Sequence, residues 1–141
     1  MKIDNEHLSF LHSPFSINKM SSAHPLAALL TGHFDAIMER ERTNRSSVHL
    51  YGAGDYWVAF EQSAYQLCQL MPSCETTLFR FAVYPFPVVM ASVTDAQLQS
   101  FVRLHILRTD QPAYKVFSVR PYSADRYRSW HRTLERGSAT S

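Results

Sequence analysis

The sequence predicts a single domain of the α/β class, in its α+β form, with one mixed β-sheet and flanking helices. A chain of 141 residues provides one hydrophobic core and too little length for two. Apolar residues recur at helical or strand spacing in the order α-β-β-α-β-β-α-β-α. Neighbouring strands joined by short turns form antiparallel hairpins, so a purely parallel sheet is not expected.

The N-terminal part is predicted to hold an irregular arm followed by a helix. Residues 1–22 show no sustained hydrophobic period, so the domain proper is expected to span residues 23–141. Pro25 suits the first turn of a helix that fades in the charged run at residues 39–42. The apolar stripe of this helix consists of Leu26, Leu29, Leu30, Phe34, Ile37 and Met38.

Two β-rich runs around a glycine-rich turn predict a hairpin. Val48–Tyr51 and Tyr56–Phe60 are rich in aromatic and β-branched residues, and Gly52–Asp55 separates them. Strand alternation places Trp57 and Ala59 on one face of the second strand and its other three residues on the opposite face.

The rest of the chain alternates helices and strands. A helix is expected to follow Phe60 and to end before Pro72, and Thr94 is the candidate N-cap of a later helix that continues to Ile106. Further strands are expected at residues 75–84, 88–93 and 113–119, and a terminal basic helix at 124–136. The predicted core residues on the helical stripes are Leu29, Phe34, Leu67 and Phe101.

Composition and motifs argue against several classes of function. Cys68 and Cys74 have C-x5-C spacing, which is typical of neither a zinc site nor a redox motif, so free thiols are expected. The 7 histidines show no metal-ligand spacing, and no nucleophile or phosphate-loop motif is present. We therefore expect no metal, no cofactor and no catalytic activity. Without an apolar leader or spanning segment, the expected location is cytoplasmic, with no membrane partner.

Charge is distributed unevenly along the chain. Residues 101–141 carry eight basic and three acidic residues, a net charge of +5, whereas residues 1–100 carry a net charge of −3. Aromatic residues are interleaved with these cations, namely Phe117, Tyr122, Tyr127 and Trp130. Such a segment fits a phosphate backbone, because arginine attracts phosphates and aromatic rings stack on bases. It equally fits an amphipathic helix that docks Tyr127, Trp130 and Leu134 on the core with its arginines in water.

Residues 48–122 resemble the N-terminal mismatch-recognition domain of the MutS DNA-repair proteins. The stretch HLYGAGDYWVAFEQSAYQL follows the family's order of a strand, a Gly-Asp turn at Gly54-Asp55, an aromatic strand and a helix that contains Ser63-Ala64. Met90-Ala91-Ser92-Val93 matches the family's segment before the next helix, and Tyr114-Lys115-Val116 matches its late strand. The resemblance implies the same scaffold as a stand-alone domain.

The sequence departs from this family where the family reads a mismatch. After the Gly-Asp turn the family has Phe-x-Glu, whereas this chain has Tyr56-Trp57-Val58, which keeps an aromatic ring and replaces the acid. Val58 makes no polar contact with a base edge, and Ser92 stands in place of a family glycine. Mismatch readout as the family performs it is therefore not expected.

Two hypotheses of function follow. The first is a non-catalytic nucleic-acid-binding module, with DNA as the partner, in which an aromatic side chain stacks on a base and cations contact phosphates. Its candidate residues are Tyr56, Trp57, Lys115, Arg120, Arg128 and Arg132. The alternative is a protein–protein interaction or structural module, in which the same aromatic and arginine side chains contact another chain or a second copy of this one. Burial of Tyr56 and Trp57 would remove the stacking site of the first hypothesis.

Overall fold

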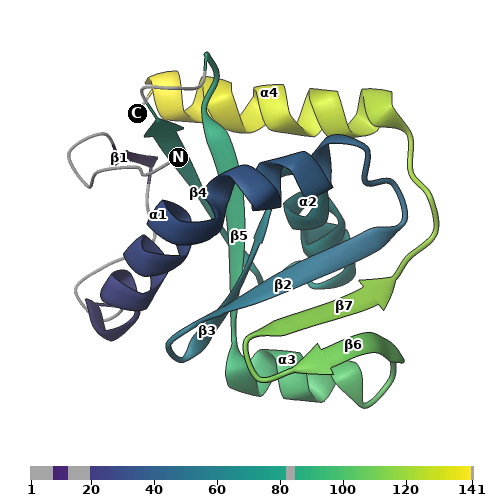
Figure 1. The fold of residues 1–141 in the computed structure, drawn as a ribbon. Helices are drawn as coiled ribbons and strands as arrows, with labels where there is room; N and C mark the ends of the chain where they lie inside the picture. The colour runs from purple at the N-terminus through teal and green to yellow at the C-terminus, as the bar shows by residue number, and fades with distance from the viewer. Residues whose placement is uncertain (1–7, 13–19, 82–84, 141) are drawn as a thin grey trace.

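The computed structural model describes residues 8–12, 20–81 and 85–140, which form one antiparallel sheet with helices packed against it (Figure 1). The elements in chain order are β1 (Leu8–His12), α1 (Met20–Arg42), β2 (Ser47–Ala53), β3 (Tyr56–Phe60), α2 (Glu61–Leu70), β4 (Glu75–Phe81), β5 (Val88–Thr94), α3 (Asp95–Val102), β6 (Leu107–Gln111), β7 (Tyr114–Ser118) and α4 (Ala124–Thr140). This arrangement confirms the predicted α+β class and the single compact domain.

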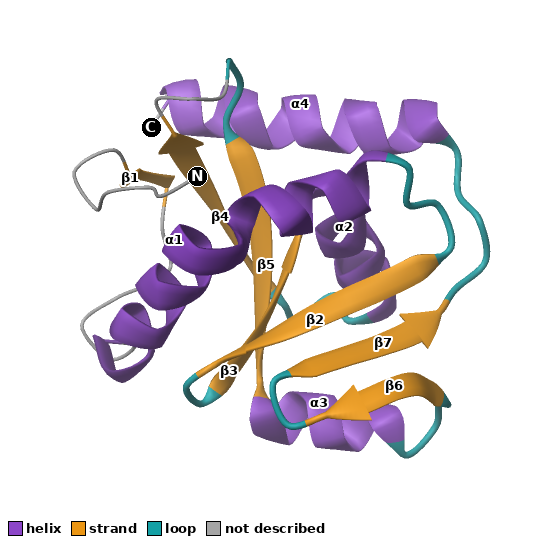
Figure 2. Cartoon of the chain, in the orientation of Figure 1, coloured by secondary structure: helices purple, strands orange, loops and turns teal. Residues whose placement is uncertain are grey.

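The sheet has seven strands in the order β1-β4-β5-β3-β2-β7-β6 within the described part of the chain. Every neighbouring pair is antiparallel, so the sheet is not mixed as the sequence analysis expected. The short turns between β2 and β3 and between β6 and β7 reverse the chain, whereas α2 and α3 each lead to a strand that runs in the same direction but is not a neighbour (Figure 2). No connection carries the chain into a parallel neighbour, which is why the strand directions alternate.

Both faces of the sheet are covered, and each has its own core. α1 lies on one face, where Phe34 packs with Phe60 and Phe81 in the first cluster. α2 and α3 lie on the other face, where Leu67, Leu98 and Phe117 belong to the second cluster. The predicted core positions Phe34 and Leu67 are fully buried. Leu29 and Phe101 are half-buried and pack at the edges of the two clusters.

The predicted hairpin is confirmed as β2 and β3. Gly54 has a φ of 66°, a conformation that glycine adopts without the steric cost of a side chain. Beyond this turn the strands pair in register, with Gly52 opposite Trp57 and Tyr51 opposite Val58. Val58 and Phe60 enter the first cluster and Trp57 and Ala59 the second, as strand alternation predicts.

Four elements differ from the predictions. β1 lies within the arm expected to be irregular, where it pairs with β4, and α1 begins at Met20, ahead of Pro25. The helix capped by Thr94 has the predicted N-terminus, with a complete capping box, but it ends at Val102. β6 follows, because pairing with β7 outweighs the helical spacing of residues 98–106.

None of the helices in the described residues combines the length and apolar character that a membrane span needs.

Candidate nucleic-acid interface and a buried polar network

Three arginines meet at one end of the β2–β7 pair. Ser47 and Ser118 are partners in the register, and Arg45 and Arg120 lie just beyond this last pair on either strand. Arg108 reaches the same end from β6, with its Nη1 atom 3.5 Å from Ser47 Oγ and 3.4 Å from Ser118 Oγ. Strand pairing therefore gathers cations that lie far apart in the sequence.

α4 carries more cations on its outer side. Arg126, Arg128 and Arg132 are exposed along this helix. Its inner side is half-buried at Trp130 and Leu134, which pack against the second core cluster. The amphipathic docking considered above is thus observed, and it turns the arginines outward.

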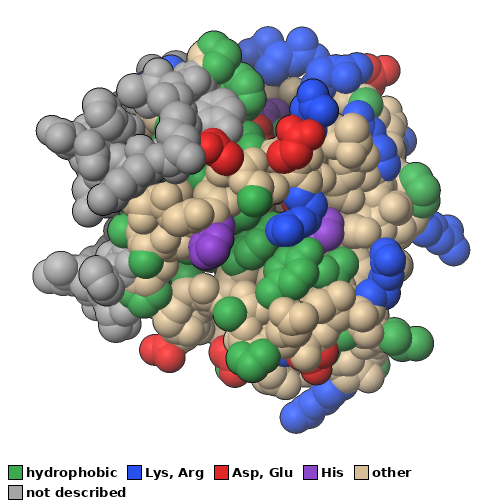
Figure 3. All heavy atoms as spheres, viewed as in Figure 1, with side chains coloured by type: hydrophobic (Ala, Val, Ile, Leu, Met, Phe, Trp, Pro, Cys, Tyr) green, Lys and Arg blue, Asp and Glu red, His purple; other side chains and the backbone are tan. Residues whose placement is uncertain are grey.

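The loop between β7 and α4 joins these two groups of cations. Tyr122 Oη donates to the Asn44 carbonyl at 3.1 Å, and Gln66 Nε2 donates to the Arg120 carbonyl at 3.5 Å. We call the combined surface the arginine band, and it consists of Arg45, Arg108, Arg120, Arg126, Arg128 and Arg132. Figure 3 shows Lys and Arg side chains in blue along the upper edge of the molecule and down its right side.

The band has little acidic compensation. Arg128 forms an ion pair with the exposed Asp125 on its own helix. The other five arginines form no ion pair with any residue that the structure describes. Most of this positive surface is therefore available to a polyanion.

The other predicted nucleic-acid residues lie elsewhere. Trp57 is 7% exposed, and its Nε1 atom donates to Asp95 Oδ1 at 2.9 Å, so its ring offers no free face to a base. Lys115 Nζ lies 5.1 Å from the centre of the Trp57 ring and forms an ion pair with Asp110. Tyr56 is half-buried at the opposite end of β2 from Arg45. Arg120, Arg128 and Arg132 are thus the predicted residues that the fold brings into the band.

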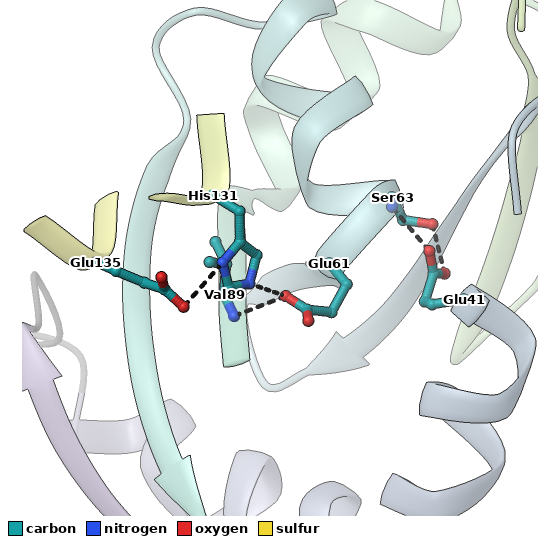
Figure 4. A network of polar contacts seen from close by, with 6 residues as sticks. All are labelled: Glu41, Glu61, Ser63, Val89, His131 and Glu135. Carbon is teal, nitrogen blue, oxygen red and sulfur yellow. Dashed lines mark hydrogen bonds and ion pairs between the residues drawn. The ribbon is translucent and has the colours of Figure 1, made fainter. Parts of the chain in front are cut away.

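A second polar cluster is buried beneath α4. β3 runs directly into α2 at Glu61, which has a φ of 48° and is 4% exposed. Its Oε2 atom accepts a hydrogen bond from Val89 N at 3.1 Å and lies 2.8 Å from His131 Nε2 (Figure 4). The Glu61 carboxylate thus accepts a hydrogen bond from the Val89 amide of β5. This amide has no β3 residue to pair with, because the chain leaves the sheet at Glu61.

His131 joins α4 to this carboxylate. Its Nδ1 atom lies 3.2 Å from Glu135 Oε1 one turn along the helix, so two carboxylates flank one imidazole (Figure 4). Burial opposes the charged form, but hydrogen bonding and charge from Glu61, together with Glu135, outweigh it and raise the pKa of His131. Burial and the neighbouring Glu61 carboxylate also raise the pKa of Tyr127.

Glu41 has a structural role at the start of α2. Phe60, the N-cap of that helix, provides no side-chain hydrogen bond. Glu41 accepts from Ser63 N at 2.8 Å, from Ser63 Oγ at 2.6 Å and from Asn44 Nδ2 at 3.0 Å. It therefore caps α2 from another helix. Burial raises the pKa of Glu41 to about 7, against these stabilising hydrogen bonds.

The sequence patterns do not predict this cluster. Glu61 and His131 are 70 residues apart, and no short motif joins them. Only the tertiary structure brings them together.

Comparisons with family models, curated proteins and solved structures find no match for this chain. The resemblance to the MutS mismatch-recognition domain stays a prediction that rests on the quoted motifs.

Proposed function

We propose that this chain is a non-catalytic nucleic-acid-binding module that holds phosphates on the arginine band. The observation that carries this proposal is the gathering of arginines from β6, α4 and two loops on one surface, most of them without an acidic partner in the described part of the chain. Arginine presents several donors in a planar fork that matches phosphate oxygens. Such contacts position a nucleic acid without reading its sequence.

Mismatch readout is not part of the proposal. Val58, which stands where the MutS family has its acid, is fully buried in the first core cluster. Changing it to Glu would bury a charge in the core, so we expect misfolding and no gain of mismatch preference. Affinity should be equal for matched and mismatched duplexes.

The proposal is tested by fluorescence anisotropy with labelled duplex, mismatched duplex and single-stranded DNA over a series of salt concentrations. We compare wild type with Arg120→Ala, and with Arg80→Ala as the control, because Arg80 is exposed on β4 in a distant part of the sheet. Loss of one phosphate contact should lower the slope of log K against log salt by about one. The control should leave the slope unchanged, and absence of binding to any nucleic acid at low salt would refute the proposal.

A second candidate function is self-association through the β6 edge. β6 is the last strand of the sheet, and just before it Leu104 and Ile106 are 83% and 87% exposed. An unpaired edge beside exposed apolar side chains is a template for pairing with another chain. Sedimentation of wild type and a Leu104→Ser, Ile106→Ser double variant tests this. A wild type that is monomeric at high concentration excludes it.

A further inference from the structure

A cavity of about 830 Å³ lies between α1 and α4, beside the buried Glu–His network. Its walls are the two helices, the first turn of α2 contributes to its lining, and Phe86 comes from the turn before β5. Pockets for small molecules have volumes of roughly 300–1,000 Å³. Of its lining residues, Arg128 and Arg132 belong to the arginine band, and the proposed nucleic-acid function leaves the interior of the cavity without a role.

The deep part of the cavity is negatively charged. Glu61 and Glu41 line it and are 4% and 1% exposed. Glu135 adds a carboxylate whose side chain is 31% exposed. His131 is the buried cation among the lining residues, and it is shared between two of these carboxylates. Glu41 is only partly ionised at neutral pH, because its pKa is about 7, but Glu61 and Glu135 still outnumber the imidazole that they share where water screens charge least.

The arginines of the cavity are at its mouth. The side chains of Arg42 and Arg128 are 72% and 60% exposed, and each forms an ion pair with an acid on its own helix. Arg132 also lines the cavity and is exposed, with no ion pair among the described residues. Water and salt screen such exposed charges, so they contribute little to the field inside a pocket. They do not reverse the sign of the interior.

Apolar and aromatic surface completes the lining. Three such residues line the cavity. Phe86 is 39% exposed, and Met38 and Tyr127 are half-buried. The rings of Phe86 and Tyr127 both approach His131 edge-on, with centroids 6.3 and 5.8 Å from the imidazole. Aromatic faces attract cations, and methionine adapts to ligands of irregular shape.

We propose that this cavity is a binding site for an organic cation, namely a protonated amine carried on an aromatic or short apolar body. The ammonium group lies toward Glu61 and Glu135, and the body lies against Met38 and Phe86. The network then has two roles: it docks α4 on the sheet, and it gives the cavity its charge preference. Carboxylic acids and neutral molecules of the same shape bind more weakly.

Calorimetric titration of the full chain with three probes of similar shape tests the charge preference. The probes are 2-phenylethylamine, 2-phenylethanol and phenylacetate. We expect the amine to bind about tenfold more tightly than the alcohol, the effect of one charge-assisted hydrogen bond, and phenylacetate to bind most weakly. Equal or tighter binding of phenylacetate, or no binding of any probe at millimolar concentration, would overturn the proposal.

Variants locate the binding. Glu135→Gln should weaken the amine about tenfold, whereas Glu39→Gln, at the exposed ion pair of the mouth, should change its affinity less than twofold. Met38→Trp fills the cavity and should abolish binding. Arg120→Ala, which tests the nucleic-acid proposal, should leave amine affinity unchanged, so the two proposals fail independently. Amine binding that survives both Glu135→Gln and Met38→Trp would place the amine outside the cavity.

Discussion

The arginine band and the buried Glu–His network place charge in opposite environments. Most arginines of the band are exposed and have no acidic partner among the described residues, so their field extends into the solvent and is screened by salt. Glu61 and His131 are less than one-tenth exposed and satisfy one another. We therefore expect the band to contribute to the proposed binding and little to folding, and the network to contribute to folding.

α4 links the two regions, because both use this helix. His131 is bonded to Glu61, and the exposed Arg128 and Arg132 of the same helix belong to the band. The position of these two arginines depends on how the inner side is docked. Changes in the network should consequently disturb binding through stability, while changes in the band should leave stability intact.

The largest expected effect is the loss of Glu61. Glu61→Ala leaves Val89 N and His131 Nε2 without their acceptor, and breaking a buried pair costs about 3–5 kcal/mol. Urea unfolding followed by circular dichroism measures this change in the free energy of unfolding. A loss below about 1 kcal/mol would mean that the network contributes little to stability.

Two variants sharpen that comparison. Glu39→Ala removes an exposed ion pair on α1, and we expect a change within about 0.5 kcal/mol. Glu61→Gly removes the carboxylate but relieves the positive φ at this position. It should be about 1 kcal/mol more stable than Glu61→Ala, because glycine adopts that conformation without steric cost.

The next effect is a pH dependence that comes from Glu41. Its pKa is raised from 4.5 to about 7 in the folded protein, so the unfolded chain binds fewer protons between these values. The contribution of Glu41 to the free energy of unfolding is therefore largest below pH 4.5. It falls by roughly 3 kcal/mol as the pH rises through 7. Glu41→Gln does not titrate, so its unfolding free energy relative to wild type should rise over this window.

The pH dependence of Glu41 is measured as a difference between variant and wild type, because His49 changes the free energy of unfolding with pH in the opposite direction. Burial and the charges of Arg40 and Arg108 lower the pKa of His49 from 6.5 to about 4. The contribution of His49 to the free energy of unfolding therefore increases as the pH rises through that range. His131, with its raised pKa, loses stability as the pH rises through its folded value. A Glu41→Gln difference that is flat between pH 4.5 and 7 would show that the buried carboxyl has a normal pKa.

Local sequence patterns predicted most of the fold and three of the six arginines in the arginine band. The hairpin turn at Gly54 and the cap at Thr94 are set by neighbouring residues, so sequence reasoning placed them correctly. Arg120, Arg128 and Arg132 belong to one basic stretch and were identified from it. Arg45 and Arg108 join them only because β2 and β6 both lie beside β7, and pairing over such distances leaves no local signal.

The smallest expected effect concerns Tyr56, the aromatic candidate of β3 that is not fully buried. Tyr56 lies opposite Ala53, which is six residues along β2 from Ser47, at the end of the strand near Arg45. At the usual rise of a strand, this is a distance of about 20 Å. A nucleic acid held on the arginine band need not reach this ring. Tyr56→Ala should therefore change DNA affinity less than twofold in the anisotropy assay, well below the effect of Arg120→Ala. A stacked base contributes about 1–3 kcal/mol, so a loss of tenfold or more would show that the interface runs over the β2–β3 turn. In that case Lys115→Ala, beside Trp57, should also weaken binding, and the arginine band would be at most one part of the site.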